Sequence, residues 1–167
     1  TGILMAVIAA LVQSQGFASA VAPMAGRTPV EVHPNPGERA FEQRVQGAPA
    51  LTLAPGFNVV FAGNLGTVQA LDTVIAAAAL LRDEPKVRFV LIGSGSRGEA
   101  LQAEAARLRL DNVQFAGRFP PDAMPGLLAQ ASALLVSLNR DDILAQTIPS
   151  KIQAYLAAGR PLIASLD

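Results

Sequence analysis

Residues 57–72, FNVVFAGNLGTVQALD, combine an apolar strand, a turn with two glycines and the start of a helix. Such a segment can build a phosphate site, because backbone N–H groups of the turn and the positive end of the helix dipole can both face an anion. We expect Gly63 and Gly66 to form this turn and a helix to begin near Thr67. The same pattern also makes an ordinary tight connection, so other parts of the chain must decide between the two.

Strand-like and helix-like segments alternate from residue 57 onward, which is typical of an α/β fold with a doubly wound, Rossmann-like parallel sheet. The strands are continuous apolar runs, as expected for strands covered on both faces. They are expected at 59–62, 88–92, 113–116, 133–138 and 161–164. Apolar residues at helical spacing predict helices at about 71–81, 101–108, 122–131 (with Asp122 as N-cap) and 149–159.

The segment before residue 57 has a different character. A helix ending near Ala25 and a short strand at 29–33 precede residues 34–56, which are rich in Pro and Gly and have no clean period. We therefore expect residues 1–56 to be the end of a preceding domain with its interdomain linker. Residues 57–167 are expected to be a Rossmann-like nucleotide-sugar-binding domain that is truncated at its C-terminus.

Composition excludes several kinds of site. Thirteen basic and thirteen acidic side chains cancel, so no basic excess favours nucleic acid or anionic lipid, and an anionic ligand must be held locally. The chain has no cysteine, which excludes disulfides, thiolate metal sites and a cysteine nucleophile. Its one histidine, His33, is interpreted as structural, and a histidine-rich metal site is excluded.

The apolar run at residues 3–12 is too short to cross a bilayer, which takes about twenty apolar residues. Ala18, Ser19 and Ala20 form a small-residue pattern like that of a signal-peptide cleavage site, but no basic residue precedes the run and no initiator Met is present. We favour a buried helix or strand here. Since the chain has no disulfides to gain from export, we expect a cytoplasmic protein.

Ligands of open parallel sheets bind outside the carboxyl ends of the strands, so the residues after each strand matter most. A second glycine turn, Gly93-Ser94-Gly95, follows the strand at 88–92; it suits close backbone approach to a ligand but is also a common structural turn. The GxxxxGK[ST] spacing is absent, so no P-loop is indicated. Residues 93–98, GSGSRG, have the GxGxxG spacing, but that spacing by itself is a weak signal, and we do not predict a dinucleotide site from it.

Charged residues at other strand ends add candidates. Lys151 lies at a helix start, where a cation opposes the helix dipole, and is a candidate phosphate partner or a solvated lysine. Arg118, next to Phe119, could pair with phosphate or stack on a base, or be an exposed loop residue. The adjacent Asp141 and Asp142 suggest a metal, but in a polar loop they more often form a solvated turn.

Together these motifs resemble a known family. FAGNLG, VRFVLIGSGS, LDNVQFAGRFP, ALLVSL and TIPSKIQAYLAAGRPLIAS are similar to the C-terminal, donor-binding half of GT-B glycosyltransferases of family 4, in the bacterial branch that builds surface polysaccharides. The resemblance covers residues 57–167, and PSK…AAGRP is its most specific part. The upstream VQSQGF and VEVHPNP resemble the end of the N-terminal domain and the interdomain crossing of that family.

The resemblance implies retaining transfer of a sugar from a nucleotide diphosphate sugar, with UDP-sugar the expected donor, and without a metal or other cofactor. The reaction would take place between two Rossmann-like domains. The acceptor glycan or lipid-linked glycan and the catalytic residues would belong to the missing N-terminal domain, so this fragment alone is expected to be inactive. The whole enzyme could associate peripherally with the inner face of the membrane, and no nucleic acid partner is expected.

Matching positions give the expected site residues. Gly63, Asn64, Gly66 and Lys151 would lie at the diphosphate. The nucleotide pocket would be formed by Gly93, Gly95, Arg118 and Phe119, and the donor sugar or its loop would involve Gln146, Thr147 and Ser150.

The chain departs from the family pattern at charged positions. Many members have Arg after the first glycine and Lys further along the turn, where this chain has Asn64 and Gln69. Two glutamates separated by seven residues, which bind donor sugar and ribose hydroxyls in the family, align with Gln146 and Ala154. The resemblance therefore implies a diphosphate site of reduced charge.

Two other functions remain open. A sugar-nucleotide 2-epimerase shares the GT-B architecture but needs catalytic histidines and carboxylates, and residues 57–167 contain no histidine. A non-catalytic Rossmann-like assembly module would explain the lost charges. A flavodoxin-like receiver is disfavoured because Gly63-Asn64 is not an acidic cluster.

Overall fold

The computed structural model describes residues 9–34, 50–141 and 148–166. Residues 9–34 form a small unit with two paired parallel strands, β1 (Ala10–Val12) and β2 (Val30–Val32). The helix α1 (Gln15–Ala25) connects the two strands. Ser14 begins the helix, since its side-chain oxygen accepts a hydrogen bond from the Phe17 N–H at 3.1 Å. The helix and strand expected near residue 25 and at 29–33 are confirmed. Of the apolar run at 3–12, the end forms β1 and residues 3–8 lie outside the described part.

The second unit is a five-stranded parallel sheet with the strand order β5-β4-β3-β6-β7. Along the chain, β4 and β5 are added on one side of β3, and β6 and β7 are then added on its other side. The direction in which strands are added therefore reverses between β3 and β6. This is the doubly wound, Rossmann-like sheet that the sequence predicts, with each strand within two residues of its expected bounds. The strands are β3 (Phe57–Ala62), β4 (Val87–Ile92), β5 (Val113–Gly117), β6 (Ala133–Ser137) and β7 (Leu162–Ser165).

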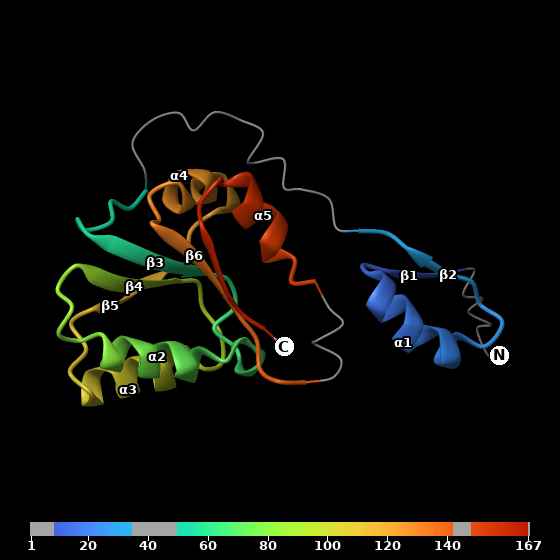
Figure 1. Ribbon diagram of the computed structural model, residues 1–167, viewed down its shortest axis with the longest axis horizontal. Coiled ribbons are helices and arrows are strands. Elements are labelled where there is room, and N and C mark those ends of the chain that lie inside the picture. The colour runs from blue at the N-terminus through green and yellow to red at the C-terminus, as the bar shows by residue number, and fades with distance from the viewer. Residues whose placement is uncertain (1–8, 35–49, 142–147, 167) are drawn as a thin grey trace, which may run out of the picture.

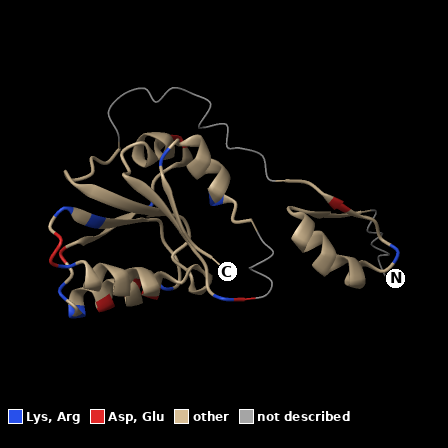
Figure 2. Cartoon of the chain, viewed as in Figure 1, with Lys and Arg blue, Asp and Glu red and all other residues tan. Residues whose placement is uncertain are grey.

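Helices cover both faces of this sheet (Figure 1). The longer pair, α2 (Leu71–Leu80) and α3 (Gly98–Arg107), covers one face, and α4 (Met124–Leu128) and α5 (Lys151–Ala157) cover the other. Alternate side chains of each strand serve the two faces, so the central strand β3 sends Val59 and Phe61 into one apolar cluster and Val60 and Ala62 into the second. β3 and β6 contain no Lys, Arg, Asp or Glu, as the colouring of Figure 2 shows and as expected for the buried centre of the sheet.

Two helix starts differ from the sequence prediction. The helix expected near Thr67 is a short 3₁₀ helix, η2 (Thr67–Gln69), and α2 begins only after Ala70, whose left-handed backbone (φ 49°) separates the two. Asp122 is not an N-cap, because it lies inside a second 3₁₀ helix, η3 (Pro121–Ala123), which leads directly into α4 without a side-chain cap. Proline at the start of each element fixes this tight geometry.

The edge strand β7 also differs from expectation. All four of its residues are exposed, whereas the sequence predicts strands covered on both faces. It pairs with β6 on one side, and its apolar side chains Leu162 and Ile163 are 37% and 43% exposed.

The end of the stretch expected to be a linker packs on the second unit. Leu53 is buried in the same apolar cluster as α4 and α5. Its N–H donates to the side-chain oxygen of Gln130 at 3.0 Å, and the Gln130 amide donates to the Leu51 carbonyl at 2.9 Å. Residues 35–49 of that stretch lie outside the described residues. Among the described helices, none is long and apolar enough to cross a membrane.

Candidate functional site

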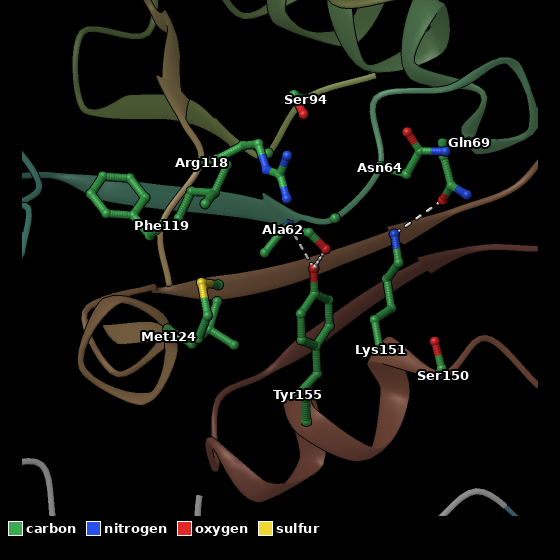
Figure 3. A pocket seen from close by; sticks show the side chains of 15 residues that line it. Ala62, Asn64, Gln69, Ser94, Arg118, Phe119, Met124, Ser150, Lys151 and Tyr155 are labelled. Atoms are coloured by element: carbon green, nitrogen blue, oxygen red, sulfur yellow. Dashed lines mark hydrogen bonds between the residues drawn. The ribbon is translucent and has the colours of Figure 1, made fainter. Parts of the chain in front are cut away.

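A pocket of about 640 Å³ lies over the carboxyl ends of β3, β4 and β5, on the side where α5 begins (Figure 3). This is the edge where open parallel sheets bind their ligands. The lining residues come from the ends of these three strands, from η2 and from α4 and α5. They are Ala62, Gly63, Asn64, Gln69, Ile92, Gly93, Ser94, Arg118, Phe119, Met124, Leu128, Ser150, Lys151, Ala154 and Tyr155.

The two glycine turns form one wall of the pocket by packing against each other. The Gly63 N–H donates to the Ile92 carbonyl at 2.9 Å, and the Leu65 N–H donates to the Ser94 carbonyl at 2.9 Å. The contact is so close that a Cβ on Gly93 would stand 1.8 Å from the Gly63 oxygen, and one on Gly95 would stand 2.4 Å from Asn64 Oδ1. Glycine is therefore required here by the second turn's contact with the first.

This packing changes what the first turn can offer an anion. Two of its N–H groups, those of Gly63 and Leu65, already bond to carbonyls of the neighbouring strand and turn. The helix that was expected to point its dipole at the turn is a three-residue 3₁₀ segment, and α2 starts further on. Fewer backbone donors are therefore left for an anion at this wall, and cationic side chains become more important there.

Lys151, the first residue of α5, supplies that charge. Its Nζ lies 3.8 Å from the centroid of the Phe61 ring and donates a hydrogen bond to Gln69 Oε1 at 3.0 Å. A Cβ placed on Gly63 would lie 3.1 Å from Nζ, so the ammonium sits directly at the glycine turn. Burial disfavours the charged form and lowers the pKa of Lys151 from 10.5 to about 8. The ammonium is thus a partly desolvated cation at the pocket wall.

Tyr155, one turn further along α5, fixes this helix to the sheet. Its hydroxyl accepts a hydrogen bond from the Ala62 N–H at 2.7 Å and donates to the Ala62 carbonyl at 3.0 Å (Figure 3). The residue is 1% exposed, and burial raises the pKa of its phenol. Both groups of Ala62 are at the end of β3, so Tyr155 places the start of α5 beside the glycine turn.

Arg118 and Phe119 come from the segment after β5 and line another part of the pocket. Arg118 is exposed, whereas Phe119 is half-buried and packs against the apolar cluster of α4 and α5. In Figure 3 the Arg118 side chain points toward the region between Ala62 and Ser94. An apolar ring and a guanidinium in the same pocket suit a ligand that has both a flat and an anionic group.

Most of the residues expected from the sequence come together here. Seven line the pocket: Gly63, Asn64, Gly93, Arg118, Phe119, Ser150 and Lys151. Gly66 and Gly95 do not line the pocket. A Cβ on either glycine would approach the Asn64 side chain, so both glycines lie behind that side chain. Gln146, Thr147 and Asp142 are outside the described residues, while Ala154 lines the pocket.

Sequence reasoning did not assign a site role to Gln69 or Tyr155. Gln69 was noted only as a departure from the family, and Tyr155 only as an inward-facing helix residue. Both act through contacts with residues more than eighty positions away, for which the sequence holds no local signal. Among the described residues, no group of three or more His, Cys, Asp or Glu is placed to bind a metal ion.

Residues 56–166 match the family model described as "Glycosyl transferases group 1". A sequence relative is a protein of Escherichia coli (strain K12) named as a colanic acid biosynthesis glycosyl transferase, WcaI. The two are 38% identical over 101 residues, which are 60% of this chain and 24% of the relative. The chain thus spans about a quarter of the length of this curated relative.

Solved glycosyltransferase structures share the fold. TarM of S. aureus, in a complex that includes UDP, superposes with a TM-score of 0.71 at 15% identity, covering 95% of this chain and 30% of TarM. Anabaena HepE, in complex with UDP-glucose, superposes with a TM-score of 0.70 at 19% identity, covering 95% of this chain and 44% of HepE. These matches confirm the resemblance to the C-terminal, Rossmann-like domain of GT-B glycosyltransferases. Because the family model spans most of its length, the chain belongs to the family of group 1 glycosyl transferases.

Proposed function

We propose that this chain is the donor half of a glycosyltransferase and binds a nucleotide diphosphate sugar, with UDP-sugar the preferred class. The observation that carries the proposal is the charge of the pocket. Its described lining residues include two cationic side chains, Lys151 and Arg118, and no carboxylate. A pocket of this kind favours a compact anion with a flat group attached.

Each part of such a donor finds a suitable surface. Lys151 lies at the glycine turn and would offset the negative charge that develops on the diphosphate as it leaves. This is electrostatic stabilisation of a departing anion. Arg118 and Phe119 would contact the base by stacking and by charge. A volume of about 640 Å³ is within the usual range for small-molecule sites. TarM and HepE, which share the fold, are both described in complexes with UDP.

The complete reaction needs more than this chain. We propose retaining transfer without a metal ion, as the resemblance to family 4 implies, with Lys151 in the charge-neutralising role. The acceptor and the catalytic residues would be provided by a second domain, so the fragment alone should bind donor without turnover. Participation in surface polysaccharide synthesis at the cytoplasmic face of a membrane remains a prediction that the relative WcaI, named for colanic acid, makes attractive.

A ligand-stabilisation experiment tests the proposal. The melting temperature of the 167-residue chain is measured with UDP, GDP, ADP and sodium phosphate at equal ionic strength. A ligand that binds only the folded state raises the melting temperature by an amount that grows with the logarithm of its concentration relative to its Kd. At equal ligand concentrations we expect the largest shift with UDP and almost none with phosphate. No shift with any of the three nucleotides would contradict donor binding, and equal shifts with UDP and phosphate would contradict recognition of the nucleotide.

A further inference from the structure

The lysine ammonium in the pocket is held by groups that carry no charge. Gln69 belongs to η2 and Lys151 to α5, and the two are 82 positions apart in the sequence. Gln69 Oε1 accepts a hydrogen bond from Lys151 Nζ at 3.0 Å, drawn as a dashed line in Figure 3. On another side, the Phe61 ring lies 3.8 Å from the same nitrogen. An amide oxygen and an aromatic ring therefore orient the ammonium beside the glycine turn.

We propose that Gln69 is a positioning residue of the anion site, which holds the Lys151 ammonium at the glycine turn without neutralising it. The inference deepens the proposed function and rests on it, since the anion is the diphosphate of the donor. Gln69 itself stays uncharged, so the full charge of Lys151 remains available to the ligand.

The choice of an amide matters because both alternatives would impair the site. A carboxylate in the place of Gln69 would form a charge-assisted hydrogen bond with Lys151 and compete with the incoming diphosphate. An apolar side chain would remove the accepting oxygen and leave the half-buried ammonium with one contact fewer. Only a neutral acceptor both fixes the ammonium and leaves its charge unpaired.

The surroundings of Lys151 support this assignment. Among the described residues lining the pocket, the other charged or titratable groups are Arg118, from the segment after β5, and Tyr155, on α5. The Tyr155 hydroxyl is already hydrogen-bonded to both backbone groups of Ala62. The remaining polar side chains near the turn, Asn64, Ser94 and Ser150, are neutral.

The arrangement couples anion binding to protonation. Burial lowers the pKa of Lys151 to about 8, and a bound diphosphate would favour the charged form and raise it again. The affinity for the diphosphate is then highest below the pKa of Lys151 in the unliganded protein and decreases as pH rises through about 8. Gln69→Glu should move this inflection to higher pH, because the new carboxylate stabilises the ammonium. Gln69→Leu should move it to lower pH, because the ammonium loses an acceptor.

The test measures affinity and protonation in the same variants of the 167-residue chain. UDP and inorganic pyrophosphate are titrated calorimetrically into wild type, Gln69→Glu, Gln69→Leu and the control Gln102→Glu, between about pH 6.5 and about pH 9.5. Gln102→Glu makes the same charge change on the exposed face of α3. The pKa of Lys151 is followed by NMR of its side chain. Ionisation of the ligand is the same for every variant, so differences between variants report the protein.

We expect Gln69→Glu to bind UDP and pyrophosphate about tenfold or more weakly near neutral pH, while Gln102→Glu binds like wild type. The NMR pKa of Lys151 should increase in the order Gln69→Leu, wild type, Gln69→Glu. Equal pKa values of Lys151 in the three proteins, a different order of these values, or equal affinities for wild type and Gln69→Glu would overturn the role of Gln69. If wild type itself binds pyrophosphate but not UDP, the nucleotide part of the proposed function fails while the role of Gln69 is still decided by pyrophosphate and NMR.

Discussion

The turn after β3 and the start of α5 lie beside each other at the pocket but contribute different things to it. The turn has the glycines that suggest a phosphate cradle, yet the N–H groups of Gly63 and Leu65 are bonded to the β4 strand and its turn. The start of α5 has Lys151, which provides a cation, and Tyr155, which fixes the helix to β3. The difference teaches that glycines here shape the wall, while the charge comes from a helix that follows much later in the sequence.

The largest expected effect comes from a substitution that separates the two packed glycine turns. In Gly93→Ala, the new Cβ would stand 1.8 Å from the Gly63 oxygen, and the residue would have to keep a φ of +136°. We expect a loss of about 3 kcal/mol or more in the free energy of unfolding, because backbone on both sides must move. Urea denaturation monitored by circular dichroism measures it.

Gly159→Ala is the matched control, since Gly159 also has a positive φ (+64°) but has no atom within 4 Å of the position of a Cβ. Only the backbone cost, about 1 kcal/mol, should appear. If the two variants were equally stable, contact between the glycine turns would not be what requires glycine at position 93.

The second effect loosens α5. Tyr155→Phe keeps the buried ring but removes both hydrogen bonds to Ala62, leaving a backbone N–H and carbonyl without these partners. We expect a loss of about 2 kcal/mol in the free energy of unfolding, together with weaker UDP binding because Lys151 is no longer placed as precisely. Urea denaturation and calorimetry with UDP check the two parts, and a variant as stable as wild type would show that the hydroxyl does not anchor the helix.

A smaller effect follows from the charge on Lys151 itself. Its pKa is about 8 in the folded chain against an ordinary value of 10.5, so between these values the folded state binds fewer protons than the unfolded state. The free energy of unfolding should therefore rise with pH in this window, by about 1 kcal/mol after allowing for solvent screening. The raised pKa of Tyr155 acts in the opposite direction, but only above the usual phenol range.

Comparing wild type with Lys151→Met isolates this contribution, because every other titrating group is shared. Urea midpoints at about pH 7.5 and about pH 9.5 should converge for the two proteins as pH rises, since neutral lysine no longer destabilises the wild type. Parallel midpoints at both pH values would mean that Lys151 is not desolvated in the folded chain.

The fold was predictable because its signals are local. Apolar runs such as VVFA and LLVS and the helical spacing of Leu71, Val74 and Ile75 depend only on neighbouring residues, and the strands were confirmed within two residues. The predicted helix starts were wrong at two places. Ala70 adopts a left-handed backbone that nothing in its neighbouring sequence indicates, and Asp122 lies inside a 3₁₀ helix that begins at a proline. The exposure of β7 depends on what packs over it, which its apolar sequence does not report.

The candidate site was predictable only in part. The rule that ligands bind at strand ends placed Gly63, Gly93 and Arg118 at one edge of the sheet, and all three line one pocket. Lys151, singled out because a cation at a helix start opposes the dipole, lines the same pocket. The sequence could not tell that the turns would bond to each other and use N–H groups expected to face an anion. Nor could it pair Gln69 with Lys151, since that contact depends on how α5 lies across the end of β3.

The affinity of Lys151→Met for UDP, measured by calorimetry near neutral pH, tests most directly whether α5 supplies the charge of the site. Methionine keeps the length and packing of lysine but has no charge, and Lys86→Met makes the same change at an exposed position between α2 and β4. We predict that Lys151→Met binds UDP at least about tenfold more weakly than wild type, while Lys86→Met is unchanged. If Lys151→Met bound UDP with wild-type affinity, the account would be contradicted. The diphosphate would then be bound by the backbone of the glycine turn without the help of Lys151.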